Sequence, residues 1–183
     1  VFDMLPVHDK AHARFDATQR TYDYFIHTQK DPFLNNSSAY YGDIKLDISS
    51  MKKAVELLPK YDDFYAFCKT PASFNNTICR VTEAHLWVDQ KRERLRFQIT
   101  SNRFLRGMIR IIVGRLLEIG TGRMTLEDFE NHLRTKQTPR IITAAYPQGL
   151  YLSKIIYPYV DLPQRTDFAA VFQYDDTGYW ESC

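Results

Sequence analysis

One stretch of the chain, residues 99–122 (ITSNRFLRGMIRIIVGRLLEIGTG), constrains the fold more than any other. At about 100° per residue, its apolar side chains cover nearly the whole circumference of a helix. A helix that is apolar almost all round belongs in a protein core rather than at a surface. The sequence therefore predicts a buried helix here, packed against a second layer of structure.

Three arginines interrupt the apolar surface of this expected helix. Helical spacing places Arg103, Arg106 and Arg110 in one narrow stripe, and Gly107 and Gly114 lie beside them. We call the three arginines the arginine stripe. A buried cation is costly unless an anion meets it, and a glycine lets another group come close. The stripe thus indicates contact with a carboxylate or a phosphate. An ordinary core helix whose arginines reach solvent is the alternative, and periodicity leaves both open.

Charge is unevenly distributed along the 183 residues, which are enough for one domain with a sizeable core. Residues 91–115 hold eight basic residues and one acidic residue, although the net charge of the chain is only +2. A local basic field fits nucleic acid or another polyanion, and it fits a solvated charged face nearly as well. For Arg92, Arg94 and Arg96 we favour the second interpretation, in which they solubilise a hairpin.

Cysteine usage and hydropathy limit the compartment and the cofactors. Cys68, Cys79 and Cys183 form an odd set without metal-ligand spacing, which predicts a reducing compartment, half-buried thiols and no metal site. No apolar run reaches membrane-spanning length, and the start has no signal-peptide pattern. The chain opens on Val1 without an initiator Met, as a domain cut from a longer protein would.

Alternation and turn residues predict an α+β fold. We expect one antiparallel sheet with helices packed on one face, in a domain of residues 1–158 followed by an acidic extension, 159–183, loosely tethered after Pro163. Besides the central helix, a helix should begin after Asp47, and a second should span residues 125–134 with Thr125 and Asp128 as a capping box. The expected extended segments are residues 1–7, 12–15, 20–28, 77–90, 95–100 and 149–157.

Four segments, in order and with matching spacing, resemble the tRNA pseudouridine synthase A family. They are His12-Ala-Arg-Phe15, Arg20-Thr-Tyr-Asp-Tyr24, residues 102–114 (NRFLRGMIRIIVG) and Gly149-Leu-Tyr-Leu152, with a weaker fifth within residues 63–68. That family isomerises uridines in the anticodon stem-loop of tRNA. The resemblance implies a pseudouridine synthase fold of two ferredoxin-like halves around a cleft, and a cytoplasmic homodimer that needs no cofactor or metal.

The resemblance covers what looks like the C-terminal half of such an enzyme. The family carries its catalytic aspartate in an Arg-Thr-Asp-Ala-Gly-Val-His motif, which these 183 residues do not contain. We therefore expect the fragment alone to be inactive. Ala11, Asp16 and Asp23 also depart from the family pattern, and the two acids are expected to weaken the local attraction for phosphate.

The resemblance also implies roles for individual residues. Arg110 would pair with the catalytic aspartate, and Tyr22 would stack on the target uracil and is a candidate for removing its C5 proton. His12 and Arg14, two apart on an expected strand, would hold the flipped nucleotide. Arg103 and Arg106 would bind RNA phosphates. Tyr24 and Phe25, in contrast, are expected to pack in the core.

Two other functions remain open from the sequence alone. The chain could be a non-catalytic RNA-binding module, or a dimerisation domain whose arginines pair with acids of a partner chain.

Overall fold

The structure, a computed structural model, describes residues 4–42, 44–137, 143–162 and 180–181. In these residues a six-stranded sheet has the order β2-β1-β4-β3-β6, and β5 also pairs with β1. The α+β prediction is confirmed. The strands are β1 (Gln19–His27), β2 (Ala39–Tyr40), β3 (Val81–Asp89), β4 (Arg94–Ser101), β5 (Leu150–Ile156) and β6 (Trp180–Glu181).

Strand β1 lies at the centre of the sheet and carries the expected aromatic run. It pairs antiparallel with β4 along one edge, where Tyr22 lies opposite Ile99. Along its other edge it pairs antiparallel with β5 and, at its end, parallel with β2. The register with β5 shifts between Thr21 and Tyr22, so that Tyr22 lies opposite Leu152 at an irregularity in the ladder.

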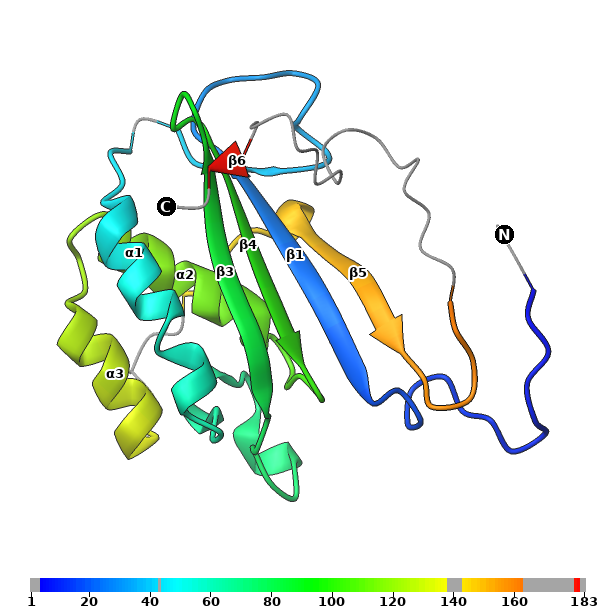
Figure 1. Cartoon of the computed structure of the whole chain (residues 1–183). Helices are drawn as coiled ribbons and strands as arrows, with labels where there is room; N and C mark the ends of the chain where they lie inside the picture. Colours follow the sequence, from blue (N-terminus) through cyan, green and yellow to red (C-terminus); the bar gives the residue numbers. More distant parts are fainter. Residues whose placement is uncertain (1–3, 43, 138–142, 163–179, 182–183) are drawn as a thin grey trace.

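The three α-helices lie on one side of the sheet, as the sequence predicts, and α3 packs on α1 rather than on the strands. In Figure 1 α2 passes behind β3 and β4. Asp47 caps α1 by accepting a hydrogen bond from the Ser50 amide at 3.1 Å. Thr125 and Asp128 form the predicted capping box of α3. The helices are α1 (Ile48–Val55), α2 (Met108–Gly120) and α3 (Leu126–Thr135), with 3₁₀ turns η1 (Leu58–Lys60), η2 (Tyr65–Phe67), η3 (Pro71–Ser73) and η4 (Pro147–Gly149).

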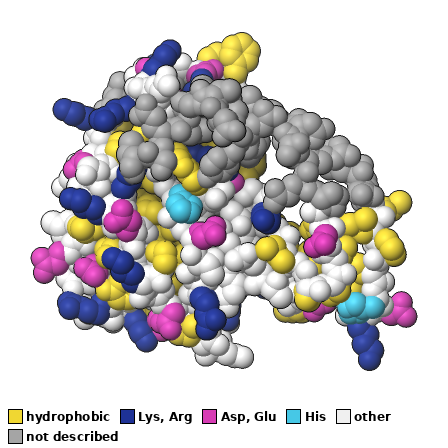
Figure 2. Space-filling view, viewed as in Figure 1, with side chains coloured by type: hydrophobic (Ala, Val, Ile, Leu, Met, Phe, Trp, Pro, Cys, Tyr) yellow, Lys and Arg dark blue, Asp and Glu magenta, His cyan; other side chains and the backbone are white. Residues whose placement is uncertain are grey.

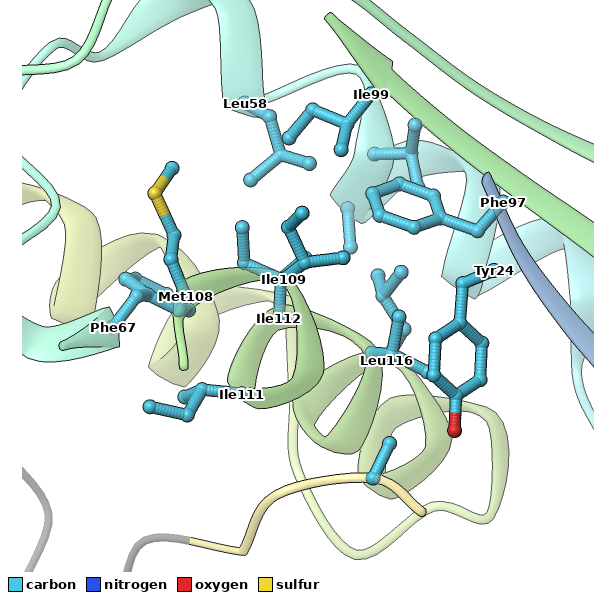
Figure 3. Packing of buried hydrophobic residues seen from close by; sticks show 14 of the residues in the cluster. Tyr24, Leu58, Phe67, Phe97, Ile99, Met108, Ile109, Ile111, Ile112 and Leu116 are labelled. Carbon is cyan, nitrogen blue, oxygen red and sulfur yellow. The ribbon is translucent and has the colours of Figure 1, made fainter. Parts of the chain in front are cut away.

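The core lies between the sheet and α2. In Figure 3 the side chains of Tyr24, Phe97 and Ile99 reach from the strands towards the helix. They meet Ile109, Ile112 and other apolar residues of α2, of whose 13 residues 11 are buried. The predicted buried helix is therefore present.

Its N-terminal boundary, however, differs from the prediction. Residues 99–101 belong to β4, residues 102–107 form a connection, and α2 begins only at Met108. The strand prevails because Ile99 is paired on both sides, with Tyr22 of β1 and Ala84 of β3. Gly107 then adopts a φ of 76°, a left-handed conformation that a helix interior does not allow.

The two ends of the chain also differ from expectation. Residues 4–7 form no strand, residues 1–3 lie outside the described part, and the expected strand 12–15 is a turn, because the His12 carbonyl accepts hydrogen bonds from the amides of Phe15 and Asp16. Near the other end, the backbone of β6 pairs with Val88 and Asp89 of β3. Trp180 and Glu181 are therefore part of the sheet rather than loosely tethered. Residues 163–179 lie outside the described part, and the domain boundary at residue 158 stays a prediction.

On the face of the molecule in Figure 2, acidic and basic side chains are interspersed. Among the described residues, none of the helices combines the length and the apolar character needed to cross a membrane.

Candidate active site

Arg110 lies in the first turn of α2 and is half-buried. Its Nε donates a hydrogen bond to the Ala145 carbonyl at 2.6 Å, and the Ala145 amide donates one to the Arg110 carbonyl at 2.8 Å. One turn further on, a Cβ added at Gly114 would lie 2.3 Å from the carbonyl oxygen of Thr143. The glycine does admit a close neighbour, as the sequence predicts, but the neighbour is the backbone of residues 143–146 rather than a phosphate or carboxylate.

The outer end of the Arg110 side chain is left open. Within the described part of the chain, its two Nη groups have no hydrogen-bond or ion-pair partner. A cation in the first turn of a helix is opposed by the helix dipole, so helix stability does not explain this residue. The dipole and the guanidinium both favour an anion at this place.

Two tyrosines hold the segment to which Arg110 is bonded. The Tyr24 hydroxyl donates to the Tyr146 carbonyl at 2.5 Å, and the Tyr41 hydroxyl accepts from the Tyr146 amide at 3.0 Å. The rings of Tyr41 and Tyr146 stack with centroids 4.9 Å apart. Burial raises the pKa of both Tyr24 and Tyr41, whereas the positive charge of Arg110 acts in the opposite direction. Both hydroxyls are therefore neutral at physiological pH.

The sequence predicts Tyr24 only as a core residue and offers no motif that includes Tyr41. The glycine at position 114 was the signal that something approaches α2 closely. It did not identify the approaching segment, because more than 25 residues separate Gly114 from residues 143–146 in the chain.

Tyr22 lies on the same face of β1 as Tyr24 and is half-buried at the margin of the core. Its ring meets Phe104 edge-on, with centroids 5.1 Å apart, and its hydroxyl has no hydrogen-bond partner among the residues described. Tyr24 is two residues from Tyr22 on β1, and its hydroxyl bonds the Tyr146 carbonyl, next to the Ala145 carbonyl that Arg110 bonds. Tyr22 and Arg110 do not bond to each other.

The arginine stripe does not exist as predicted, because two of its members precede the helix. Arg103 donates to Asn76 Oδ1 at 3.3 Å and lies 5.9 Å from the centre of the Phe74 ring. Arg106 is exposed, and its carbonyl accepts from the Lys69 amide at 3.0 Å. The helical spacing that aligned these residues with Arg110 fails because the chain remains extended through residue 101.

His12 and Arg14 do not share a strand face either, since both lie in the exposed turn before β1. His12 Nδ1 accepts from the amides of Arg14 and Phe15 at 3.2 and 3.3 Å, so part of its role is to shape this turn. Arg20 joins the turn to the connection before α2: its guanidinium donates to the carbonyls of Arg14 and Asn102. The structure therefore brings Arg14 and the 102–107 connection, which carries Arg103 and Arg106, to the same end of the sheet.

The hairpin arginines correct a further expectation. Arg96 is not solvated but 5% exposed, and its Nε lies 2.8 Å from Oδ1 of Asp23, which is 1% exposed. Its guanidinium also lies between the rings of Phe25 and Trp87, at 5.8 and 5.2 Å. Arg94 forms a more exposed ion pair with Asp31, and of the three only Arg92 is exposed to solvent. The charge of Asp23 is thus neutralised by Arg96.

The described residues bring together no group of three or more His, Cys, Asp and Glu side chains that could hold a metal ion. Cys68 and Cys79 are free thiols and are fully buried, rather than half-buried as expected. Burial raises the pKa of the Cys79 thiol to about 11, which keeps it protonated and unreactive.

The chain is similar to known proteins of one family. A family model described as tRNA pseudouridine synthase matches residues 61–158, slightly more than half of the chain. The tRNA pseudouridine synthase A of Porphyromonas gingivalis is 39% identical over 160 residues, which cover 86% of this chain and 62% of that protein. The enzyme of the same name from Bacteroides fragilis is 37% identical over 158 residues, with the same coverage.

A more distant relative, the tRNA pseudouridine synthase A of Gloeobacter violaceus, is 35% identical over 163 residues, covering 88% of this chain and 52% of that protein. The chain thus spans less than two thirds of the length of the relatives it matches. These similarities show that the chain belongs to the tRNA pseudouridine synthase family.

Proposed function

We propose that the protein isomerises uridine to pseudouridine in the anticodon stem-loop of tRNA, and that this chain supplies the cationic side of the active site. The observation that supports this most strongly is the state of Arg110. It is half-buried at the start of a core helix, fixed through Nε and open at both Nη groups. A planar guanidinium held in this way is suited to bidentate pairing with a carboxylate.

The reaction explains why such a cation is needed. The bond between ribose C1′ and uracil N1 breaks, the base turns, and C5 bonds to C1′; C5 loses a proton and N1 gains one. The nucleophile must be an ionised carboxylate in an enclosed site, and an adjacent fixed cation keeps it charged. We propose that an aspartate outside these 183 residues fills this role and that the 183 residues alone do not catalyse the reaction.

The other predicted residues have separate tasks in this proposal. Tyr22, whose ring is braced by Phe104, stacks on the target uracil. Its hydroxyl, which has no hydrogen-bond partner among the described residues, is the candidate acceptor of the C5 proton. Arg14 and His12 hold the backbone of the flipped nucleotide from the turn before β1. Arg103 and Arg106 bind phosphates from the neighbouring connection.

The family resemblance extends the proposal to the assembly. We propose that the complete enzyme is a homodimer and that it acts in the cytoplasm, where tRNA is modified. Neither the reaction nor the residues assigned here require a metal or cofactor.

An isomerisation assay on an anticodon stem-loop tests the proposal. The enzyme that includes the aspartate-bearing polypeptide should form pseudouridine, and this chain alone should not. In that enzyme Arg110→Ala should lower kcat by about 10²–10³-fold, because the nucleophile loses its partner, while RNA binding changes by less than about threefold. Arg92→Ala, which removes a solvated arginine, is the matched control.

The same assay separates the alternatives. Unchanged pseudouridine yield in the Arg110→Ala variant would rule out the ion-pair role. RNA binding without any product in the longer enzyme would favour a non-catalytic RNA-binding module, and RNA binding that is absent at low salt would favour a dimerisation domain.

A further inference from the structure

We infer that Tyr24 and Tyr41 are positioning residues for Arg110 and that they act through the backbone of Ala145 and Tyr146. The inference rests on the proposed function of Arg110 and assigns a role to residues that do not touch the substrate.

The first step concerns the arginine itself. Its side chain has several rotatable bonds, and an unrestrained guanidinium would sample many orientations. The hydrogen bond from Nε to the Ala145 carbonyl, at 2.6 Å, fixes the plane of the guanidinium group. Once the plane is fixed, the directions of the Nη N–H groups are fixed as well, and these are the donors that a carboxylate would meet.

The second step concerns the segment that holds the arginine. Residues 143–146 belong to no helix or strand, so no regular hydrogen-bond ladder holds them in place. Yet all four backbone polar groups of Ala145 and Tyr146 are paired. Arg110 bonds both groups of Ala145, and the hydroxyls of Tyr24 and Tyr41 bond the two groups of Tyr146.

The third step concerns the rigidity of the two tyrosines. Tyr24 is fully buried in the core, and in Figure 3 its hydroxyl points past Leu116 towards the yellow segment that follows residue 142. Tyr41 comes directly after β2, its amide bonds the His27 carbonyl at 2.9 Å, and its ring stacks on that of Tyr146. The sheet thus fixes both hydroxyls, the hydroxyls fix Tyr146, and the adjoining Ala145 fixes Arg110.

The contact between α2 and this segment adds a second constraint. Gly114 lies so close to Thr143 that the helix and the segment are in backbone contact one turn beyond Arg110. The segment cannot shift towards the helix, and the tyrosines prevent it from shifting away. An arginine bonded to such a segment is pre-organised before the carboxylate arrives.

Single Tyr→Phe changes test this arrangement, because they delete one hydroxyl and keep the ring. In the enzyme that includes the aspartate-bearing polypeptide, Tyr24→Phe and Tyr41→Phe should each lower kcat by about tenfold, while KM stays within about twofold. Tyr61→Phe is the matched control: it also deletes one hydroxyl hydrogen bond, to Glu130 on α3, and should leave kcat unchanged.

A second background separates positioning from general stabilisation. Arg110→Lys removes the Nε donor, so the segment can no longer orient the cation. In that background each Tyr→Phe change should lower kcat by less than about twofold, since coupled residues do not act additively. If the tyrosines lower kcat equally in both backgrounds, they do not act through Arg110 and the inference is wrong.

A direct readout is available on the chain itself. Hydrogen exchange of the Arg110 Nε–H, followed by NMR, should be faster in Tyr24→Phe and Tyr41→Phe than in Tyr61→Phe. Equal exchange in all three would overturn the inference. Failure of the proposed function looks different: Arg110→Ala would then leave pseudouridine formation intact, whatever the tyrosine variants do.

Discussion

The arginines of this chain show how strongly the surroundings of one residue type decide its role. Arg96 is buried, paired with Asp23 and enclosed by two aromatic rings. Arg94 forms an ion pair with Asp31, and both side chains are partly exposed to solvent. Arg110 is half-buried, and its Nη groups are unpaired within the described residues. Arg96 therefore stabilises the fold, whereas the unpaired Nη groups of Arg110 are the donors that, in our proposal, bind an anion.

Removing the buried arginine should be costly. Arg96→Met leaves the Asp23 carboxylate, of which Oδ2 already lacks a partner, as an uncompensated buried charge, and should lower the free energy of unfolding by about 3 kcal/mol. Arg94→Met breaks a more exposed pair and should cost less than about 1 kcal/mol. Urea unfolding of both variants measures the two changes. Equal decreases in the free energy of unfolding would show that burial does not make the Asp23–Arg96 pair more important than the exposed pair.

Tyr22 allows a prediction that separates its ring from its hydroxyl. Tyr22→Phe keeps the stacking surface and the contact with Phe104, so the affinity for an anticodon stem-loop should change by less than about threefold. Product formation should slow by about 10²-fold if the hydroxyl accepts the C5 proton. Filter binding and single-turnover kinetics measure the two effects. A large loss of affinity would mean that the hydroxyl binds the RNA instead.

At the scale of elements, the sequence predicts those helices and strands whose boundaries depend on neighbouring residues. The aromatic run of β1, the Asp47 cap and the capping box of α3 follow from nearby residues alone, and all three are confirmed. The start of α2 was missed because residues 99–107 have an apolar spacing that also fits a helix. Pairing of Ile99 with two neighbouring strands decides the outcome, and that is a contact between distant parts of the chain.

The same reason explains which parts of the site could be predicted. Arg110 and Tyr22 stand within recognisable motifs, so a sequence can point to them. The bond of Arg110 to Ala145, the bonds of Tyr24 and Tyr41 to Tyr146, and the Asp23–Arg96 pair join positions 35 to 122 residues apart. No local pattern predicts them. The strand predicted for His12 and Arg14 is wrong because hydrogen bonds to the His12 carbonyl and ring close a turn there. The spacing of the residues in the sequence does not reveal these bonds.

The contact between α2 and residues 143–146 gives a test at this scale. Alanine is normally better than glycine in a helix by about 1 kcal/mol. At Gly114, however, the new Cβ would meet the Thr143 carbonyl at 2.3 Å, so Gly114→Ala should lower both Tm and kcat. Gly122→Ala is the control: its φ of 74° makes it destabilising too, but nothing lies within 4 Å, so kcat should be unchanged. A more stable Gly114→Ala variant would refute the close contact.

At the scale of the whole molecule, the proposed RNA contacts gather at one end of the sheet. The turn with Arg14 and the connection with Arg103 and Arg106 meet there through Arg20. The solvated Arg92 lies at the opposite end of β4, about 25 Å away for a strand of eight residues. Position, rather than the number of cations, should therefore decide which arginines bind RNA.

Salt dependence of tRNA binding tests this arrangement. Arg106→Ala should reduce the slope of log K against log salt concentration by nearly 1, because one phosphate contact is lost. Arg92→Ala should leave the slope unchanged. If both variants change it equally, the basic residues act only through the net charge of the protein.

The pH dependence of stability offers a second test of the whole fold. Burial lowers the pKa of His27 below its usual 6.5, Arg94 adds to the effect, and Asp31 opposes it. Below pH 6.5 the unfolded chain therefore binds more protons at this residue than the folded chain, and the free energy of unfolding should fall as the pH drops. His27→Gln should make that fall shallower in urea titrations between pH 7 and 5. An unaltered slope would show that His27 is not the responsible group.

The buried Asp23–Arg96 pair also restricts how these two positions can change during evolution. Replacing either residue alone leaves an unpaired charge in the protein interior, which is destabilising. The pair can therefore be lost only when both residues are replaced, or after other substitutions have stabilised the protein. We expect the two positions to drift together among relatives, either as opposite charges or as two uncharged side chains.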